Sequence, residues 1–298
     1  MIDFVKIQLI NYNSDWFKKI EEKPLIEFKT TVSTKTGELS NKKEAEFRGM
    51  KLIIYESGFT LLQGSLHKYW NHGQHNYNDF TFHDLQNVIN DLKKTLDLDL
   101  NKCVLRNLEV GVNITPPINT NSILNNLIIH QGKKFKDVSL GLSNVNYKQA
   151  EHERYYLKVY NKKIQYDNQF EILNELMRIE LKIVKMIDIN KLGITSLLDL
   201  TNKKKILSLK PNLLKAWDDI VLFDETLNKN RLTNFQKETK INQWQNSNYW
   251  LGLGKQYRYE QKRIYYILVK NYSQQIQKQV RRLIEIKFGF LIHNNITY

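Results

Sequence analysis

The sequence predicts an α+β protein: an antiparallel sheet with helices on one face, followed by a mainly helical, basic region. The first observation is the order of patterns before residue 186, which runs strands, helix, strand, helix, strands. The second is that apolar residues beyond residue 186 recur mostly at helical spacing. The third is the length of 298 residues, which suits one large domain or two. We therefore expect two domains, at residues 1–186 and 187–298.

The elements of the first half follow from their residue patterns. Residues 2–9 have the composition of a strand, and residues 45–66 contain two strand-rich runs joined by a turn at Glu56-Ser57-Gly58. A helix is expected to begin after Thr81, a good capping residue, because apolar side chains then recur at helical spacing: Leu85, Val88, Ile89, Leu92 and Leu96.

The remaining elements alternate between the two periods. A strand is expected over residues 104–114, where Pro116-Pro117 ends it, and a helix over residues 122–130. Further strands are expected near residues 137–142, 155–161 and 176–184. Beyond them the pattern predicts helices to the end, apart from Gly252-Leu253-Gly254, with a long basic stretch over residues 257–288.

Positive charge is concentrated in the last third of the chain. Residues 191–298 hold 19 Lys and Arg against 8 Asp and Glu, whereas residues 1–190 hold 26 against 23. Such an imbalance attracts a polyanion over long range, which favours nucleic acid as a partner. The plainer alternative is a basic surface with no specific partner. The sequence contains no strongly amphipathic helix with a basic face and a large apolar face, so binding to a membrane surface is disfavoured.

Several classes of protein are disfavoured by what the sequence lacks. A single cysteine, Cys103, excludes an intramolecular disulfide framework and a multi-cysteine zinc site. No signal-peptide pattern and no apolar run of membrane-spanning length is present, so a cytoplasmic protein is expected. The motifs of phosphate-binding loops, of GxSxG hydrolases and of dinucleotide-binding enzymes are missing.

Two expected strands carry an unusual polar face. Because side chains alternate along a strand, one face of residues 155–163 and one face of residues 177–183 would together carry Tyr156, Lys158, Tyr160, Lys162, Arg178, Glu180 and Lys182. Tyrosines, cations and a carboxylate are suited to attack on a phosphodiester. A phenol has a pKa near 10, so it needs a neighbouring cation or base to act as a nucleophile. Aromatic packing in a sheet is the structural alternative.

Carboxylates offer ligands for a divalent cation. Glu109 shares a strand face with Gly111 and Asn113, and the small glycine leaves room for a ligand. Glu180 lies between Arg178 and Lys182, and Asp3 is a third carboxylate if its strand lies beside the others. Oxygen ligands of this kind suit Mg²⁺ or Mn²⁺. The alternatives are a solvated strand face for Glu109 and a cross-strand ion pair for Glu180.

The loop at residues 67–80 is rich in histidine and aromatic residues. His67, His72 and His75 do not have the spacing of a compact metal site, and no His-x-His pair occurs in the sequence. We expect His67 and Lys68 to contact nucleic acid. An ordered loop with packed aromatic side chains is an equally good explanation.

These motifs together resemble those of rolling-circle replication initiators. The sequence is similar to gene II/X-type replication proteins of filamentous phages and related plasmids, and more distantly to the trans-acting initiators of staphylococcal plasmids. The matching segments are Met1-Ile-Asp-Phe-Val-Lys-Ile7, Gly64-Ser-Leu-His-Lys-Tyr69, Leu108-Glu-Val-Gly-Val-Asn113, Tyr156-Leu-Lys-Val-Tyr-Asn-Lys162 and Met177-Arg-Ile-Glu-Leu181. They span residues 1–184, and a helical tail follows them.

The resemblance implies a relative of the HUH endonuclease core, although the paired histidines of that superfamily are absent. It implies metal binding by Glu109 and Glu180, with Asp3 as a possible third ligand, and a nucleophile at Tyr160 or, second, Tyr156. The product would be a 5′-phosphotyrosine and a free 3′-hydroxyl that primes a host polymerase. A host helicase is a further expected partner.

The sequence therefore predicts a metal-dependent DNA-nicking and DNA-joining replication initiator of a phage or plasmid. Origin DNA, single-stranded or hairpin with flanking duplex, would be bound by Arg178, Lys182, His67, Lys68, Lys255, Arg258, Lys262, Arg263, Arg281 and Arg282, with Lys158 and Lys162 at the phosphate. The alternatives are a non-catalytic sequence-specific DNA-binding protein, a metal-dependent nuclease with no covalent intermediate, and a related transposase or relaxase.

Overall fold

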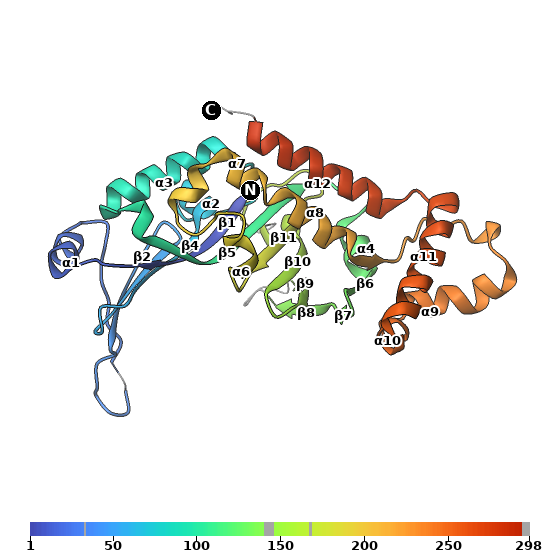
Figure 1. The fold of residues 1–298 in the computed structure, drawn as a ribbon, viewed down its shortest axis with the longest axis horizontal. Coiled ribbons are helices and arrows are strands. Elements are labelled where there is room, and N and C mark those ends of the chain that lie inside the picture. The colour runs from blue at the N-terminus through green and yellow to red at the C-terminus, as the bar shows by residue number, and fades with distance from the viewer. Residues whose placement is uncertain (33, 140–145, 167–168, 294–298) are drawn as a thin grey trace. The chain divides into compact units, whose positions relative to one another are not determined.

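The computed structural model describes residues 1–32, 34–139, 146–166 and 169–293 (Figure 1). The chain divides into two compact units, each assembled from separate segments. Unit 1 contains Met1–Gly111, Lys182–Lys210 and Gly289–Tyr298, and unit 2 contains Val112–Leu181 and Pro211–Phe288. Both units combine strands with helices, which confirms the α+β class. The predicted division into an endonuclease domain at residues 1–186 and a DNA-binding domain at residues 187–298 stays a prediction.

The sheet of unit 1 is antiparallel throughout. Its strand order is β2-β3-β4-β1-β5, and each neighbouring pair is antiparallel. The strands are β1 (Ile2–Leu9), β2 (Lys42–Phe47), β3 (Met50–Tyr55), β4 (Thr60–Ser65) and β5 (Cys103–Ile114). The predicted first strand, the turn at Glu56-Ser57-Gly58 and the strand over residues 104–114 are confirmed.

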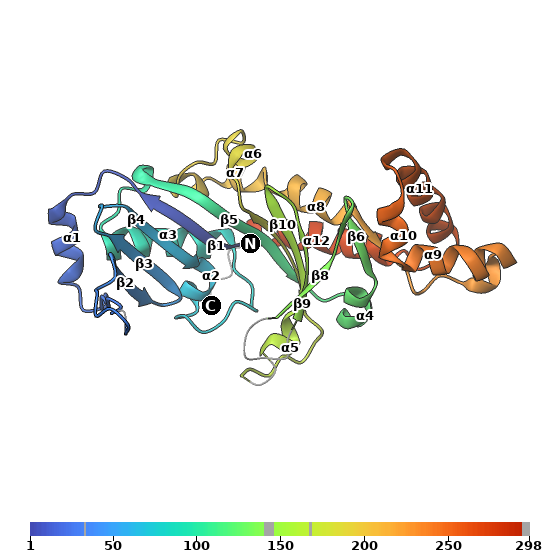
Figure 2. The same cartoon turned by 90° about the horizontal axis from the view of Figure 1, so that it is seen from below.

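Helix α3 (Phe82–Leu96) covers one face of these strands (Figure 2). Thr81 and Asp84 form a reciprocal capping box at its start, which satisfies backbone N–H groups that the first turn leaves free. The predicted apolar stripe is buried, so the prediction of this helix is confirmed. Unit 1 also contains α1 (Ser14–Glu21), α2 (Leu66–Trp70), α6 (Ile187–Asn190), α7 (Lys203–Leu207) and the short turns η1 (Leu100–Lys102) and η2 (Leu198–Thr201).

Unit 2 contains two groups of strands. In the first, β11 follows the end of β5 in the order β11-β10-β9-β8, and β10–β9 and β9–β8 are antiparallel pairs. The strands are β8 (Lys136–Ser139), β9 (Asn146–Glu151), β10 (Tyr155–Asn161) and β11 (Met177–Ile183). The second group is the antiparallel sheet β12-β6-β7, formed by β6 (Leu127–His130), β7 (Lys133–Lys134) and β12 (Ile220–Leu222).

Three predicted elements differ from the structure. The helix expected over residues 122–130 is α4 (Thr120–Asn125), and the apolar run after it is strand β6. A short apolar run fits a buried strand as well as a helix, and pairing with β12 decides between them. The same pairing makes residues 220–222 a strand in a region predicted to be helical. Lys162 starts helix α5 (Lys162–Tyr166) instead of continuing β10. Residues 140–142 of an expected strand lie outside the described residues.

The helical part of unit 2 is built on its own apolar core. The predicted basic stretch over residues 257–288 is two helices, separated at Ser273. Ile129, Trp244, Trp250 and Tyr265 are among the buried residues that join the helices to the second sheet. The elements are α8 (Lys210–Asp218), η3 (Lys229–Arg231), η4 (Gln236–Lys240), α9 (Ile241–Gln245), α10 (Ser247–Gly252), α11 (Lys255–Tyr272) and α12 (Ile276–His293). Within the described ranges, none of the helices has both the length and the apolar character needed to cross a membrane.

Candidate functional site

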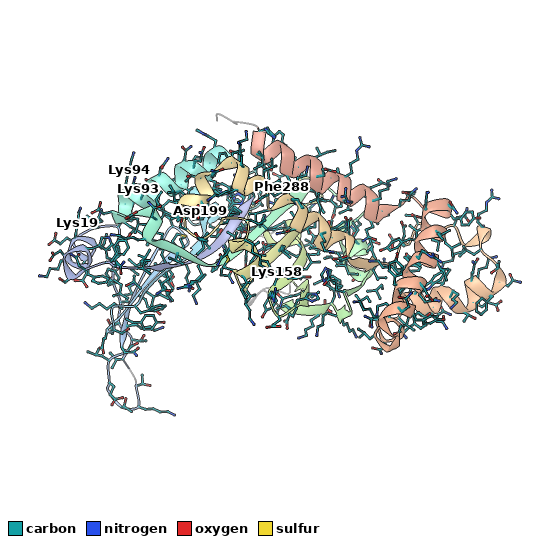
Figure 3. All side chains as sticks on the ribbon, viewed as in Figure 1. Lys19, Lys93, Lys94, Lys158, Asp199 and Phe288 are labelled. Carbon is teal, nitrogen blue, oxygen red and sulfur yellow. The ribbon has the colours of Figure 1, made fainter. Side chains whose placement is uncertain are left out.

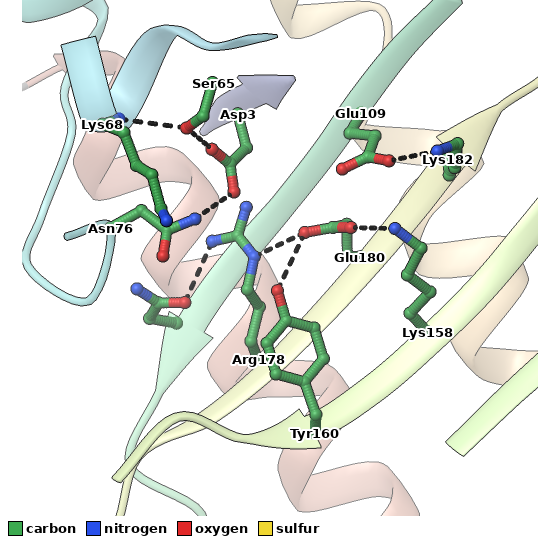
Figure 4. Close-up of polar contacts among 11 residues, drawn as sticks. Asp3, Ser65, Lys68, Asn76, Glu109, Lys158, Tyr160, Arg178, Glu180 and Lys182 are labelled. Carbon is green, nitrogen blue, oxygen red and sulfur yellow. Dashed lines mark hydrogen bonds and ion pairs between the residues drawn. The ribbon is translucent and has the colours of Figure 1, made fainter. Parts of the chain in front are cut away.

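A buried polar network in unit 2 is centred on Glu180 of β11 (Figure 4). Its Oε2 accepts hydrogen bonds from Arg178 Nε at 2.7 Å and from the Tyr160 hydroxyl at 3.2 Å. Its Oε1 accepts one from Lys158 Nζ at 3.0 Å. Exposed fractions are 2% for Glu180, 1% for Arg178 and 7% for Tyr160. The predicted phenol, cations and carboxylate of the two strands are therefore in direct contact.

Alternation along the strands explains this meeting. Lys158 and Tyr160 are two residues apart on β10, and Arg178 and Glu180 are two residues apart on β11, so each pair shares a face. Lys158 can be located on β10 in Figure 3. Arg178 reaches further, to Asn113 Oδ1 at 3.0 Å. Charges buried this deeply are tolerated only when they are paired and hydrogen-bonded, and this network meets that condition.

Lys162 lies between two tyrosine rings. Its Nζ is 5.0 Å from the centre of the Tyr160 ring and 5.1 Å from that of Tyr166, and the side chain is buried. Both distances are within the range of cation–π attraction. The predicted proximity of Lys162 to Tyr160 is therefore present, although it arises from the first turn of α5 and not from strand alternation.

Tyr156, the second candidate nucleophile, is half-exposed on β10. It is paired in register with Glu151 of β9. Its neighbour Tyr155 donates its hydroxyl hydrogen to Gln131 Oε1, at 3.2 Å. Tyr156 is thus more accessible than Tyr160, whereas Tyr160 has the carboxylate and cation contacts.

Asp3 and Glu109 belong to unit 1, on adjacent strands. In the pairing of β1 with β5, Ile2 faces Val110 and Val5 faces Leu108, so Glu109 lies opposite the irregular step that contains Asp3. The Asp3 strand was predicted to lie beside the strands of both Glu109 and Glu180. The half that concerns Glu109 is met, because β1 pairs with β5, while its other partner is β4 and not the Glu180 strand. Asp3 is 3% exposed, and its carboxylate accepts hydrogen bonds from the Ser65 hydroxyl and from Asn76 Nδ2 (Figure 4).

Glu109 forms an ion pair with Lys182 within unit 1. Lys182 Nζ is 3.1 Å from Glu109 Oε1 and 5.3 Å from the centre of the Phe4 ring. Lys182 is partly exposed, while Glu109 is buried. The cation predicted to bind phosphate therefore contacts a predicted metal ligand.

The donor chemistry of unit 1 suits a hard divalent cation. Asp3 and Glu109 provide carboxylate oxygens, and Asp3 accepts hydrogen bonds from the Ser65 hydroxyl and the Asn76 amide nitrogen. Over the part of the chain that the structure describes, no three His, Cys, Asp or Glu side chains gather as a metal-binding cluster. Mg²⁺ is commonly held by only one or two carboxylates together with water and substrate phosphates.

His67 and Lys68 lie in α2. His67 is buried, stacks on Phe80 with ring centres 4.8 Å apart, and contacts Asn78 Oδ1 through Nε2 at 2.7 Å. The Lys68 backbone N–H donates to the Ser65 hydroxyl, which caps this helix. In this structure His67 is a packing residue, and Lys68 is half-exposed.

The six basic residues predicted to bind DNA from α11 and α12 have different environments. Arg258 donates to the carbonyl oxygens of Trp250 and Leu253, both at 2.8 Å. Lys262 donates to the Asp218 carbonyl at 3.3 Å, and burial lowers the pKa of its amine. Arg281 is paired with Asp218 and Glu285. The exposed members are Lys255, Arg263 and Arg282.

Sequence reasoning missed several residues of these clusters. Asn113 was noticed only as a neighbour of Glu109, and Ser65, Asn76 and Tyr166 were not singled out. Asn76 and Tyr166 come from loop and helix positions whose approach depends on tertiary structure. No local pattern could have placed them next to Asp3 or Lys162.

A histidine pair in unit 2 also escaped prediction. His130 Nδ1 is 2.7 Å from His152 Nε2, and the Tyr155 ring stacks on His152 with centres 4.7 Å apart. Burial, followed by the proximity of His152, lowers the pKa of His130 to about 4. Burial also lowers the pKa of His152. The pair is therefore neutral at pH 7.

Comparison with known proteins finds likeness in solved structures. No protein-family model matches the sequence, and no curated protein matches it. Similar solved structures include that of a rolling circle replication initiator protein from Geobacillus stearothermophilus, with a TM-score of 0.43 and 10% sequence identity. The alignment covers 88% of this chain and 96% of that one. A likeness of this size does not establish a function, which must come from the residues of this chain.

Proposed function

We propose that the chain is a replication initiator that nicks and rejoins single-stranded origin DNA through a phosphotyrosine intermediate. The observation that carries this proposal is the contact between the Tyr160 hydroxyl and Glu180, in a network that also contains Arg178 and Lys158. A phenol becomes a nucleophile when a base takes its proton and cations stabilise the resulting charge. Glu180 is in position for the first task, and Lys162 is in position for the second.

The proposed reaction is a transesterification. The Tyr160 oxygen attacks the phosphorus and its proton passes to Glu180, while the bond from phosphorus to the 3′-oxygen breaks. The 3′-oxygen leaves as a hydroxyl after it takes a proton from water, and the 5′-phosphate stays on the tyrosine. Rejoining is the reverse, with the 3′-hydroxyl as nucleophile. Tyr156 is the second candidate nucleophile because it is more exposed on the same strand.

A divalent cation, Mg²⁺ or Mn²⁺, is part of the proposal. Asp3 and Glu109 would hold it, and it would neutralise charge on phosphate oxygens of the DNA. Glu180 is a predicted ligand as well, and its Oε2 accepts a hydrogen bond from the Tyr160 hydroxyl. We therefore assign Glu180 mainly to the orientation and deprotonation of Tyr160.

The proposed partners are origin DNA and host replication proteins. Arg178, Lys158 and Lys182 would bind phosphates of the DNA, and the basic residues of α11 and α12 would bind flanking DNA. A host polymerase would extend the free 3′-hydroxyl, after a host helicase opens the duplex.

The first experiment uses single-stranded oligonucleotides that tile the DNA encoding the chain and its flanks. Labelled DNA is incubated with the protein and Mn²⁺, then run on a denaturing protein gel. We expect a covalent band that Tyr160→Phe abolishes and that Tyr155→Phe, the matched control, retains. Loss in Tyr156→Phe instead would move the nucleophile to that residue.

The other outcomes distinguish the remaining functions. Cleavage with no covalent band would contradict the tyrosine mechanism and identify a hydrolytic nuclease. Specific binding without cleavage of any tiled sequence would identify a non-catalytic DNA-binding protein. A band that forms on DNA from a transposon end or transfer origin would assign the same chemistry to a transposase or relaxase.

A further inference from the structure

The solvent-facing side of α11 combines cations with exposed aromatic rings. Lys255, Tyr259, Arg263 and Ile267 follow one another at intervals of four residues, so they form a single row along the helix. Tyr259 is 66% exposed and Ile267 is 52% exposed. Successive members of the row are about 6 Å apart along the helix axis.

The opposite row of α11 accounts for its packing. Gln261, Tyr265 and Val269 are buried, and Tyr265 donates its hydroxyl hydrogen to the Leu222 carbonyl at 3.0 Å. The helix therefore does not need Tyr259 for its attachment to unit 2. The exposed ring of Tyr259, with a cation on each side of it along the row, is therefore available to bind a ligand.

The two charged side chains of this row do not contribute to the packing of the described structure. The side chains of Lys255 and Arg263 make no ion pair or hydrogen bond with any residue in the described ranges. Arg258 and Lys262, on the same helix, donate to backbone carbonyls instead. The helix thus separates cations that hold the fold from cations that face solvent.

We propose that this row is a platform for single-stranded nucleic acid, on which Tyr259 stacks a base while Lys255 and Arg263 bind flanking phosphates. A basic groove or row with exposed aromatic side chains is the usual means of binding single strands, because every unpaired base offers a π-face. In a duplex the base faces are covered by their neighbours, and the ring of Tyr259 would have no comparable use. The proposal deepens the proposed function, since it rests on a nucleic-acid partner, but it does not depend on nicking.

The test measures binding by fluorescence anisotropy in EDTA, where cleavage is not required. The probes are a short labelled oligothymidylate, an abasic strand of equal length and charge, and a duplex of equal length. We expect wild-type protein to prefer oligothymidylate. Tyr259→Ala should lose about 5- to 100-fold in affinity for it, which corresponds to one stacked base, and should bind the abasic strand like wild type. Tyr259→Phe should retain the affinity.

Arg263→Ala should weaken binding of oligothymidylate and the abasic strand alike, and should reduce the slope of log affinity against log salt by about 0.7. Two matched controls should bind like wild type. Tyr272→Ala removes a less exposed ring from another side of α11, and Lys229→Ala removes an exposed charge from η3. An oligouridylate arm shows whether the ligand is any single strand or DNA alone.

Unchanged affinity of Tyr259→Ala for oligothymidylate would overturn the proposal, as would a wild-type preference for the duplex. Failure of the proposed function would be separate, because it is read from the covalent band of wild type and Tyr160→Phe. A platform without a covalent band leaves this inference standing and removes the nicking mechanism. A covalent band together with unchanged binding by Tyr259→Ala would support the nicking mechanism and overturn the platform.

Discussion

Glu180 and Arg178 form an ion pair in which the two side chains are 2% and 1% exposed and Nε lies 2.7 Å from Oε2. They are two residues apart on β11, so the pair is formed within one strand face. The same carboxylate contacts Tyr160 and Lys158. A change at this carboxylate should therefore affect both the stability of unit 2 and the state of the phenol.

Glu180→Gln should lower the free energy of unfolding by about 3 kcal/mol, because it leaves the Arg178 charge buried with a neutral partner. Urea denaturation followed by circular dichroism measures the change. Glu27→Gln, at an exposed position, should change stability by less than about 0.5 kcal/mol. If Arg178→Met in the Glu180→Gln background restores no stability, the ion pair is not the source of the loss.

Lys162→Met should slow formation of the covalent band by at least about tenfold, since it removes the cation nearest the Tyr160 ring and the stabilisation of a phenolate. The matched control is Lys163→Met, whose lysine contacts the Leu173 carbonyl instead of a tyrosine ring. Rates come from quenched time courses on the same oligonucleotide. Equal rates for the two variants would remove Lys162 from the mechanism.

Glu109→Gln should weaken Mn²⁺ binding by about tenfold or more, because a carboxylate ligand is replaced by a neutral amide. The measurement is titration of the DNA-free protein with Mn²⁺, followed by electron paramagnetic resonance of the free ion. Asp3→Asn should behave similarly. Glu180→Gln, assigned to Tyr160, should bind Mn²⁺ as wild type does, and a loss there equal to that of Glu109→Gln would return Glu180 to the metal site.

Stability should fall on acidification through the His130–His152 pair. The pKa of buried His130 is about 4 in the folded protein and about 6.5 when exposed, so the unfolded chain binds the proton more strongly between these values. The contribution is complete above pH 6.5, declines as the pH falls towards 4, and amounts to a loss on the order of 3 kcal/mol.

Denaturation at several pH values between 7 and 4 tests this prediction. His130→Gln cannot titrate, so its stability should depend less on pH than that of wild type. His83→Gln, at an exposed position on α3, should keep the wild-type dependence. Parallel curves for wild type and His130→Gln would show that carboxylates alone cause the acid sensitivity.

Gly64→Ala should strongly destabilise unit 1. Gly64 has φ of 153°, and a Cβ there would lie 2.3 Å from the Gly49 carbonyl oxygen and 2.7 Å from the Met50 Cα. These are backbone atoms of the first residue of β3 and of the residue before it, which cannot move aside without disturbing the pairing of Met50 with Gly64. Thermal unfolding should show a large drop in midpoint, while Gly252→Ala, in open space, should leave the midpoint within a few degrees.

The sequence predicted those strands and helices in which the regular spacing of apolar or polar residues continues over a long segment. The apolar stripe after Thr81 and the alternation along β10 and β11 are of this kind. The alternation put Tyr160 and Glu180 on the polar faces of their own strands, whereas their contact is a finding of the structure. The strand at residues 127–130 was predicted as helix because three apolar residues fit either period until a partner strand is known.

Contacts between distant segments could not be predicted from local patterns. The approach of Asn76 to Asp3 and the meeting of His130 with His152 depend on tertiary packing. The separation of the basic residues of α11 into internal and exposed groups also follows from packing, since Arg258 and Arg263 are chemically identical in the sequence. Lys162 was predicted to lie close to Tyr160 on the same strand. The proximity is confirmed, but Lys162 lies at the start of helix α5 and not on the strand.

The discontinuous make-up of the two units limits how the gene can evolve. The chain passes between the units four times, and two of these passages lie inside strands β5 and β11. A truncation that starts anywhere from residue 2 to residue 288 and runs to residue 298 therefore removes part of unit 1 and all or part of unit 2. Exchange of one unit between related genes would require several simultaneous crossovers. We expect inheritance of the coding sequence as one block, with variation by substitution and by insertion in surface loops.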